Sequence, residues 1–496
     1  MRCVVFGATG YLGGRLVPEL LRAGHTVRVM ARSPGKLDDA AWRDQVEVVA
    51  GDVTAAEQVR AALAGQEVLY YLVHSLTRAD FEEVDRTAAT SVAREAARAE
   101  LTRVVYLGGI TPSGQRLSRH LASRAEVGRI LAEGGAEQSL PPVPVLVLRA
   151  AVIIGSGSAS FEMLRYLTER LPAMVTPRWV HNKIQPIAVR DVVYYLVAAA
   201  NPELELEGTF DIGGPDVLSY LEMMRGYARV AELPRRVIVP VPVLTPWLSA
   251  QWVNLVTPVP KSIAVPLMES LVNDVVCRDR RIADHIPDPD AGLAGYEHAV
   301  ALALAKTRDL DVPTRWSDAD TFGAPSDPLP SDPVWSGGSL YRDLRERHTG
   351  ADPATLWAVV EAIGGENGWY SFPLAWSVRG WIDRAWGGVG LRRGRRDPHR
   401  LHEGEALDWW RVESIDRPRT LRLRAEMRVP GRAWLQLSVH EAAGSGARYR
   451  QLALFEPHGL AGHLYWKAIA PFHSVIFGGM ARNITGAAQA RTNPPA

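Results

Sequence analysis

The chain has 496 residues, of which 47% are hydrophobic and 22% are charged. This is an ordinary composition for two or three globular domains. The formal net charge of +1 argues against a nucleic-acid-binding protein, which usually carries a strongly basic face. Two cysteines, Cys3 and Cys277, are too few for a disulfide framework and fit a reducing compartment.

We expect a cytoplasmic protein without an integral membrane segment. No uninterrupted apolar run is long enough to span a bilayer. The first expected strand begins at residue 3, which leaves no room before it for a signal peptide. Peripheral contact with a membrane stays open, and the composition sets no oligomeric state.

The first 200 residues alternate apolar runs typical of strands with stretches of helical periodicity. Strands are expected at 3–6, 26–31, 46–50, 68–73, 104–107 and 145–148, and helices at 15–21, 55–63, 82–100 and 117–133. Alternating strands and helices predict an α/β fold, a doubly wound parallel sheet covered on both faces. Residues from about 150 to 310 are more irregular. In proteins with such a sheet, this part usually builds a small substrate subdomain beside it, which we expect here.

The most informative segment is MRCVVFGATGYLG at residues 1–13, where a short apolar strand runs into a glycine turn and then a helix. This arrangement places a dinucleotide pyrophosphate on a helix N-terminus. Gly7 permits the tight turn, Gly10 lets the backbone approach the phosphates, and Gly13 lets the helix pack against the strand. The turn therefore predicts a dinucleotide-binding domain.

A boundary follows near residue 320. The proline-rich stretch at 321–333 reads as an extended linker, separating a first domain at 1–320 from a second at 334–490. The second domain is expected to have antiparallel strands at 420–429, 433–439 and 447–455 and a closing helix at 463–482. It is rich in tryptophan: Trp335, Trp357, Trp369, Trp376, Trp381, Trp386, Trp409, Trp410, Trp434 and Trp466.

The glycine turn, the Gly51-Asp52-Val53 segment and the stretch at 186–192 together resemble the short-chain dehydrogenase/reductase superfamily. The branch most similar is that of the atypical, NmrA-like NAD(P)H-binding proteins, over roughly the first 310 residues. In that superfamily the Asp of the Asp-Val pair contacts adenine, which implies such a role for Asp52 beside Val53.

Charge at the end of the second strand bears on the choice of cofactor. An NAD enzyme places Asp or Glu there to hold the ribose 2′-hydroxyl, whereas this chain offers Arg32, then Ser33 and Lys36. A guanidinium binds a 2′-phosphate that a carboxylate would repel. The sequence favours NADP(H) over NAD(H), and the alternative is that Arg32 is only a solvated strand end.

The catalytic positions depart from the pattern of the superfamily, which places Ser after strand five and Tyr-x-x-x-Lys on the next helix. Gly108 stands where Ser is expected, and His120 and Arg124 keep the spacing of Tyr and Lys. Four residues apart on a helix, they share one face. His120 is a candidate acid near neutral pH, and Arg124 is a candidate ligand of ribose or phosphate. The alternative is that both only face the cofactor.

The substitutions resemble an atypical subgroup that is marked by Leu72-Val73-His74-Ser75-Leu76 and by the His-Leu-Ala-Ser-Arg stretch at 120–124. His74 and Ser75 are therefore candidates to compensate for the missing Tyr and Ser, although Ser75 also suits a helix or turn cap. The expected cofactor-binding residues are Gly7, Thr9, Gly10, Tyr11, Leu12, Gly13, Arg32, Ser33, Lys36, Asp52, Val53, Val73, His74, Gly108 and Arg124.

The second domain resembles an uncharacterised domain often fused to this subgroup, and its pattern is similar to the START/helix-grip fold. That fold wraps an antiparallel sheet around a long C-terminal helix and encloses an apolar cavity. Its tryptophans are candidates to contact a lipophilic ligand, and ordinary core positions are the alternative. His458 and His463 near Glu456 match no strong metal motif, so no metal is expected. The basic run at 392–396 reads as a solvated loop, with an acidic ligand or a membrane surface as alternatives.

Three functions remain open on the sequence. The first is an NADP(H)-dependent oxidoreductase that acts on a small hydrophobic carbonyl or enone-like molecule. The second is a non-catalytic NADP(H)-binding sensor, which the loss of Ser, Tyr and Lys favours. The third is a lipid-binding protein whose nucleotide site is regulatory.

Overall fold

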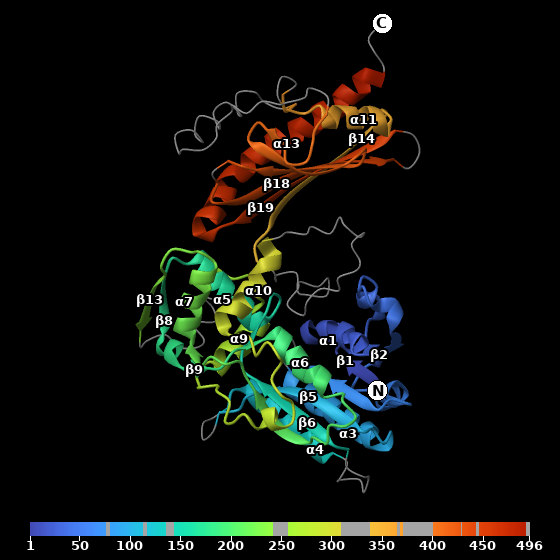
Figure 1. Ribbon diagram of the computed structural model, residues 1–496, viewed down its shortest axis with the longest axis vertical. Helices are drawn as coiled ribbons and strands as arrows, with labels where there is room; N and C mark the ends of the chain where they lie inside the picture. The colour runs from blue at the N-terminus through green and yellow to red at the C-terminus, as the bar shows by residue number, and fades with distance from the viewer. Residues whose placement is uncertain are drawn as a thin grey trace. The chain divides into compact units, whose positions relative to one another are not determined.

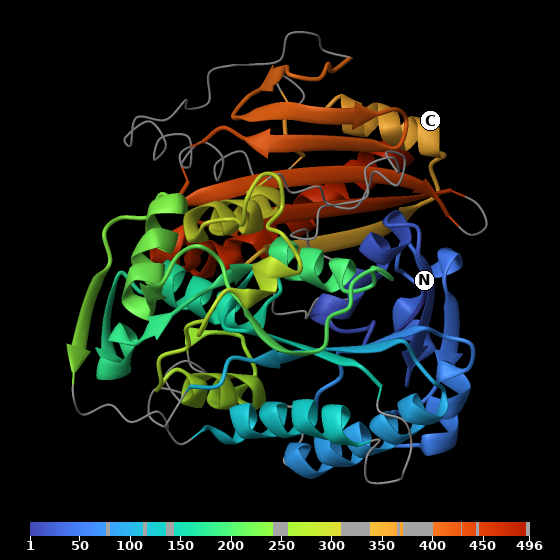
Figure 2. The ribbon, with the colours of Figure 1, turned by 60° about the horizontal axis from the view of Figure 1, so that its bottom comes forward.

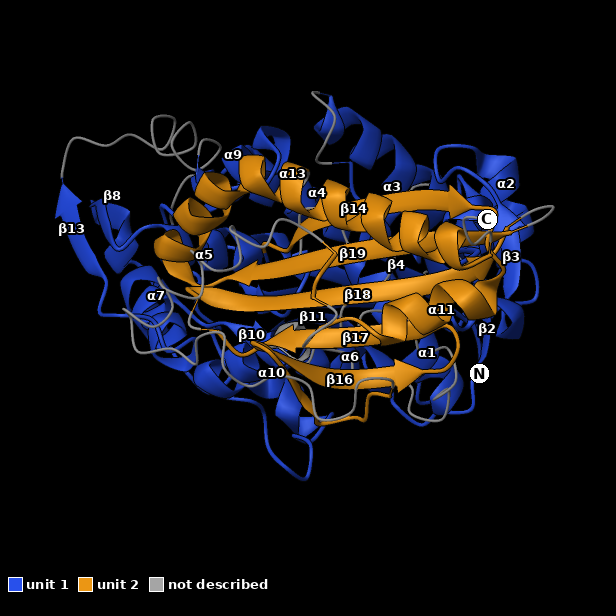
Figure 3. Cartoon of the chain, turned by 90° about the horizontal axis from the view of Figure 1, so that it is seen from above, with its two compact units in different colours: residues 1–338 blue, residues 339–496 orange. Residues whose placement is uncertain are grey.

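The computed structural model describes residues 1–75, 80–112, 117–134, 143–241, 256–308, 338–364, 368–370, 400–427, 429–442 and 446–492. The chain divides into two compact units, Met1–Gly338 and Ser339–Ala496, which are coloured separately in Figure 3. The predicted linker at 321–333 and the basic run at 392–396 lie outside the described residues.

A seven-stranded parallel sheet forms the centre of the first unit, in the order β11-β6-β5-β4-β1-β2-β3. The chain winds outward from β1 in both directions, so the strand order reverses between β1 and β4. Ligands of doubly wound sheets bind at the carboxyl ends of the strands on either side of such a reversal. The strands are β1 (Arg2–Phe6), β2 (Thr26–Ala31), β3 (Glu47–Ala50), β4 (Val68–Tyr71), β5 (Arg103–Gly109), β6 (Val145–Ala150) and β11 (Gly208–Ile212).

Helices cover both faces of this sheet, as predicted (Figure 2). Alternate residues of β1 point to opposite faces, so Cys3 and Val5 join one core while Val4 and Phe6 join the other. The first core is closed by α1 (Tyr11–Arg22) and α6 (Val189–Ala198), and the second by α2 (Ala56–Leu63), α3 (Phe81–Arg98) and α4 (Arg119–Glu133).

The rest of the first unit has a separate core of its own (Figure 1). It contains the helices α5 (Ala159–Arg170), α7 (Tyr220–Val230), α9 (Lys261–Ser270) and α10 (Tyr296–Arg308). Helix α9 packs against both α4 and α5, which brings it beside the carboxyl end of the sheet. Short strand pairs complete this part: β7 (Ile153–Ile154) with β10 (Ile187–Ala188), β9 (Lys183–Ile184) with β12 (Leu218–Ser219), and β8 (Ala173–Pro177) with β13 (Val237–Val241).

The second unit is a six-stranded antiparallel sheet with two helices on one face. The order is β14-β19-β18-β17-β16-β15. The predicted strand at 420–429 ends at Ala425, and the predicted helix at 463–482 extends from Gly459 to Thr492. The elements are β14 (Tyr341–Thr349), α11 (Pro353–Glu361), β15 (Ala406–Leu407), β16 (Trp410–Asp416), β17 (Thr420–Ala425), β18 (Gly431–Glu441), β19 (Ala447–Pro457) and α13 (Gly459–Thr492).

Candidate functional site

The glycine turn leaves the N-terminus of α1 open. Gly7 has a φ of 99°, and a Cβ on it would lie 2.8 Å from the carbonyl oxygen of Leu72. A Cβ on Gly13 would lie 2.2 Å from the carbonyl oxygen of Gly7. Gly10 is the N-cap of α1, makes no side-chain cap and is followed by no acidic residue in the first turn. The positive end of the helix dipole is therefore available to an anion.

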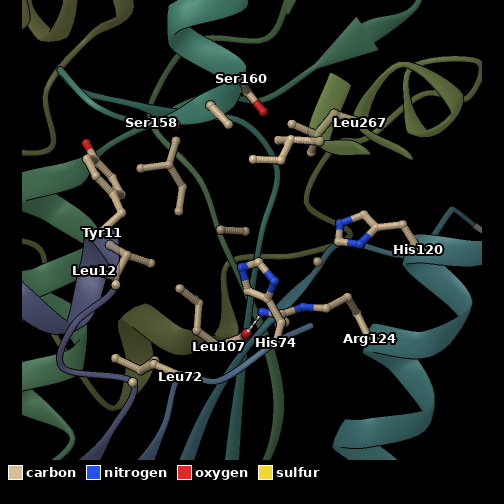
Figure 4. Close-up of a pocket in the computed structure, with 18 of the residues that line it drawn as sticks. Tyr11, Leu12, Leu72, His74, Leu107, His120, Arg124, Ser158, Ser160 and Leu267 are labelled. Atoms are coloured by element: carbon tan, nitrogen blue, oxygen red, sulfur yellow. Dashed lines mark hydrogen bonds between the residues drawn. The ribbon is translucent and has the colours of Figure 1, made fainter. Parts of the chain in front are cut away.

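A cavity of about 390 Å³ begins at this turn and continues along the carboxyl ends of β4, β5 and β6 (Figure 4). One wall carries His74 after β4, together with His120 and Arg124 from α4. Another part of the lining is mostly apolar and carries Ile263 and Leu267 from α9, a helix that packs against α4. The other lining residues are Gly7, Gly10, Tyr11, Leu12, Gly13, Leu72, Leu107, Gly108, Gly109, Ala150, Ala151, Ile153, Gly157, Ser158, Ala159 and Ser160.

Packing against β5 fixes the side chain of Arg124. Its Nη2 donates a hydrogen bond to the carbonyl oxygen of Leu107, and its guanidinium lies 5.1 Å from the ring centroid of Tyr106. The hydroxyl of Tyr106 donates to the carbonyl oxygen of Arg124 at 3.1 Å. A guanidinium has five N–H donors, so Arg124 retains donors for a ligand.

The surroundings lower the pKa of both histidines that line the pocket. Burial, with the positive charge of Arg124, lowers the pKa of His120 to about 3. The same two causes lower the pKa of His74 to about 4. His74 is accessible from the cavity although protein atoms surround it on most sides. The imidazolium that the sequence suggested for His120 near neutral pH is therefore not populated in this pocket.

Ser75 does not line the cavity. Its hydroxyl and its backbone N–H donate hydrogen bonds to the buried carboxylate of Asp85 in α3, whose pKa is raised by burial. This contact ties the segment after β4 to the following helix. It is not a helix cap, because the N-cap of α3 is Asp80 and a capping side chain accepts a hydrogen bond from a backbone N–H. Both the catalytic and the capping role of Ser75 therefore stay predictions.

The residues expected at the adenosine end lie at the carboxyl ends of β2 and β3, outside the described pocket lining. Arg32, Ser33 and Lys36 are exposed. The carboxylate of Asp52 accepts hydrogen bonds from the backbone N–H of Thr54 at 2.9 Å and from its hydroxyl at 2.7 Å. The remaining expected residues, Val53 and Val73, pack against the core beneath α2–α4, and Thr9 is half-buried in the glycine turn.

Sequence reasoning missed Arg15, which is almost fully buried on α1. Its guanidinium lies 4.0 Å from the ring centroid of Tyr11, and it donates hydrogen bonds to the carbonyl oxygens of Tyr11 and Ser156. Arg15 thereby joins the glycine turn to the loop before α5. Sequence reasoning also missed Ile263 and Leu267, although their spacing of four residues on one helix was visible in the sequence.

The described tryptophans of the second unit are mostly core residues. Trp357, Trp369, Trp409 and Trp410 are buried in its main hydrophobic cluster, and Trp434 is buried elsewhere. Trp376, Trp381 and Trp386 lie outside the described residues, as does Trp335.

His463 shares a hydrogen bond of 2.9 Å with the hydroxyl of Tyr341. In the part of the chain that the structure describes, no three His, Cys, Asp or Glu side chains gather as metal ligands would.

The parallel sheet, the glycine turn and the uncapped helix N-terminus define an NAD(P)H-binding domain of Rossmann type, and its residues fit a dinucleotide. Residues 7–137 match the family described as NAD(P)H-binding. Residues 335–480 match a family described as a protein of unknown function, DUF2867.

Individual proteins similar to this chain are similar over its first part. Ceramide reductase of Caulobacter vibrioides is 28% identical over 304 residues, covering 60% of this chain and 92% of that protein. The mitochondrial NADH dehydrogenase [ubiquinone] 1 alpha subcomplex subunit 9 of Arabidopsis thaliana is 27% identical, covering 48% of this chain and 60% of that protein. The structure of Citrobacter sp. triphenylmethane reductase complexed with NADP(H) superposes with a TM-score of 0.50 at 18% identity, covering 61% of this chain and 100% of that chain. This last likeness concerns the fold.

Proposed function

We propose that the protein is an NADP(H)-dependent oxidoreductase that reduces the carbonyl or enone of a small hydrophobic molecule. One observation carries this proposal: a single cavity joins the glycine turn to His74, His120 and Arg124. Nucleotide-binding and polar side chains thus meet where a cofactor and a substrate would react.

Arg32 supports NADP(H) rather than NAD(H). It follows β2, is exposed, and has no hydrogen-bond or ion-pair partner among the residues that the structure describes. Its guanidinium is therefore free to bind a 2′-phosphate, with Ser33 and Lys36 close in sequence. The solved reductase that shares the fold was complexed with NADP(H).

The polar wall would stabilise negative charge on the substrate oxygen. Bound NADPH supplies the reducing equivalents. Arg124 and one N–H of each neutral imidazole, His74 and His120, would donate hydrogen bonds to the carbonyl oxygen of the substrate, on which negative charge develops during reduction. The pKa values of both histidines lie near 3 to 4. We therefore propose that water, rather than either imidazole, donates the proton that the substrate oxygen receives.

A hydrophobic substrate fits the apolar part of the lining. Ile263 and Leu267 of α9 face the cavity together with Ala150, Ala151 and Ile153. The relative from Caulobacter vibrioides is named for ceramide, and a relative from Methylococcus capsulatus, 33% identical over 140 residues, is named sterol demethylase protein B. Both names refer to lipids, which agrees with apolar walls.

A non-catalytic NADP(H) sensor is the second candidate. The observation that favours it is the replacement of the usual Ser, Tyr and Lys by Gly108, His120 and Arg124, with His120 uncharged at neutral pH. A START/helix-grip assignment for the second unit, with a lipophilic ligand, remains a weaker proposal, because its described tryptophans are mostly buried in the core.

The deciding experiment measures binding and turnover separately. NADPH binding to the full chain is followed by fluorescence, and NADPH oxidation is then screened against a panel of hydrophobic ketones, aldehydes and enones. We expect turnover, and we expect His120→Ala to lose it while still binding NADPH. His298→Ala, at an exposed histidine of the same unit, is the matched control. Tight NADPH binding without turnover on any substrate would instead favour the sensor.

A further inference from the structure

The long helix α13 packs against the sheet of the second unit through one face. Trp466 stacks between Tyr341 at 5.1 Å and Phe455 at 5.6 Å, measured between ring centroids. Further along the same face, Phe477 and Met480 are buried in the core. This side of α13 therefore packs against the rest of the second unit, where the helix contacts β14, β19 and α11 (Figure 3).

The opposite face of the first half of α13 is apolar and exposed. The exposed fractions are 39% for Leu460, 59% for Leu464, 65% for Phe472 and 61% for Val475. Spacings of four, eight and three residues place these side chains on one side of a helix. Four of the ten large apolar side chains exposed among the described residues lie on this single stripe.

The stripe ends within the helix. Among the side chains that the structure describes between Leu460 and Val475, the exposed ones are apolar except for Lys467, whereas Arg482 and Asn483 are exposed beyond Val475. A contiguous stripe of large exposed apolar side chains is normally covered by a partner. The first half of α13 therefore needs a partner on its outer face, and the second half does not.

The charges of α13 indicate what that partner is. Its 34 residues contain no Asp or Glu, and its only charged side chains are Lys467, Arg482 and Arg491. An apolar helix stripe that carries Lys467 and no carboxylate suits an anionic bilayer surface, in which Lys467 reaches up to the head groups. A second copy of the chain suits it less, because a two-fold interface would bring the same cations together.

We propose that the stripe formed by Leu460, Leu464, Phe472 and Val475 docks the protein on the surface of a bilayer that contains anionic phospholipids. The helix would lie in the plane of the interface. None of the described helices is long and apolar enough to cross a membrane. The proposal stands independently of the reductase function, although a surface-bound enzyme would meet hydrophobic substrates there.

Flotation of the full chain with vesicles tests this surface. Vesicles of phosphatidylcholine alone are compared with vesicles that also contain phosphatidylglycerol. We expect binding to the anionic vesicles, and a loss of at least about tenfold in Leu464→Glu and in Phe472→Glu, because burial of each side chain is lost. We expect Lys467→Gln to weaken binding about fivefold. Leu344→Glu, at an exposed leucine on β14 of the same unit, is the matched control and should bind as the wild type does.

Each result is decisive because all of these positions are exposed, and circular dichroism and thermal unfolding verify that the variants fold. The proposal is overturned if the wild type floats with neither vesicle, or if it binds both equally. It is also overturned if Leu464→Glu floats as well as Leu344→Glu does. A dimer in analytical ultracentrifugation that Leu464→Glu dissociates, without vesicle binding, would assign the stripe to a second copy instead.

Discussion

Gly13 should not tolerate even a methyl group. A Cβ at this position would lie 2.2 Å from the carbonyl oxygen of Gly7, 2.8 Å from the carbonyl carbon of Gly7 and 2.8 Å from the Cα of Ala8. All three are backbone atoms, which cannot rotate away as a side chain can. Gly13→Ala must therefore move α1 away from the glycine turn. Overpacking costs about 1–3 kcal/mol, and the rigid neighbours place this case near the upper end, at about 3 kcal/mol.

Calorimetry of the full chain measures this cost. For a unit of 338 residues, about 3 kcal/mol corresponds to a fall of about 4 °C in Tm. The relevant transition is identified as the one that NADPH raises, since a ligand stabilises the unit that binds it. NADPH affinity should fall as well, because the displaced helix carries the N–H groups at the turn.

Gly128→Ala is the matched control for Gly13→Ala. Gly128 is a buried glycine inside α4, but a Cβ there would lie 3.4 Å or more from its nearest neighbours, the side-chain atoms of Tyr106 and Val147. We expect this variant to be neutral or more stable by up to about 1 kcal/mol, from helix propensity. If Gly13→Ala unfolds at the same temperature as Gly128→Ala and binds NADPH equally well, the reasoning about close backbone approach is refuted.

Four further predictions concern charged and titratable side chains. Arg32→Glu should weaken NADPH binding at least about tenfold relative to NADH, and an unchanged ratio of the two Kd values would contradict the assignment of Arg32. Because the pKa values of His120 and His74 are lowered from 6.5 to about 3 and about 4, the unfolded chain takes up protons first on acidification. Stability should therefore fall as the pH drops from about 6.5 to about 4, less steeply in His120→Gln, as acid titration of unfolding would measure. For the same reason kcat/KM should show no histidine titration between about pH 6 and pH 8. In the second unit Glu361 accepts hydrogen bonds from an indole N–H and from Arg417, each at 2.8 Å, and Glu361→Ala should cost about 2 kcal/mol in denaturant unfolding.

The sequence by itself determined the dinucleotide-binding turn. Gly7, Gly10 and Gly13 act within one strand–turn–helix segment, so their spacing already contains the geometry that the structure shows. Alternating strand and helix patterns likewise fixed the parallel sheet, because each element buries one periodic face. The antiparallel strands of the second unit were visible for the same reason.

Only the tertiary structure decided which polar residues share a pocket. His74, His120 and Ile263 come from three distant elements, and no sequence spacing relates them. Ser75 is next to His74 in sequence, yet it turns to Asp85. The lowered pKa of His120 also depends on packing, because desolvation and the charge of Arg124 are set by the surroundings rather than by the residue type.

The outer face of α13 illustrates the same division. The first half of its sequence is rich in large apolar residues, which by itself predicts that most of them are buried. The structure shows that the sheet covers only one side and leaves Leu464 and Phe472 exposed. Local periodicity predicts which apolar side chains are buried. Only the folded structure shows which of them the rest of the unit leaves uncovered.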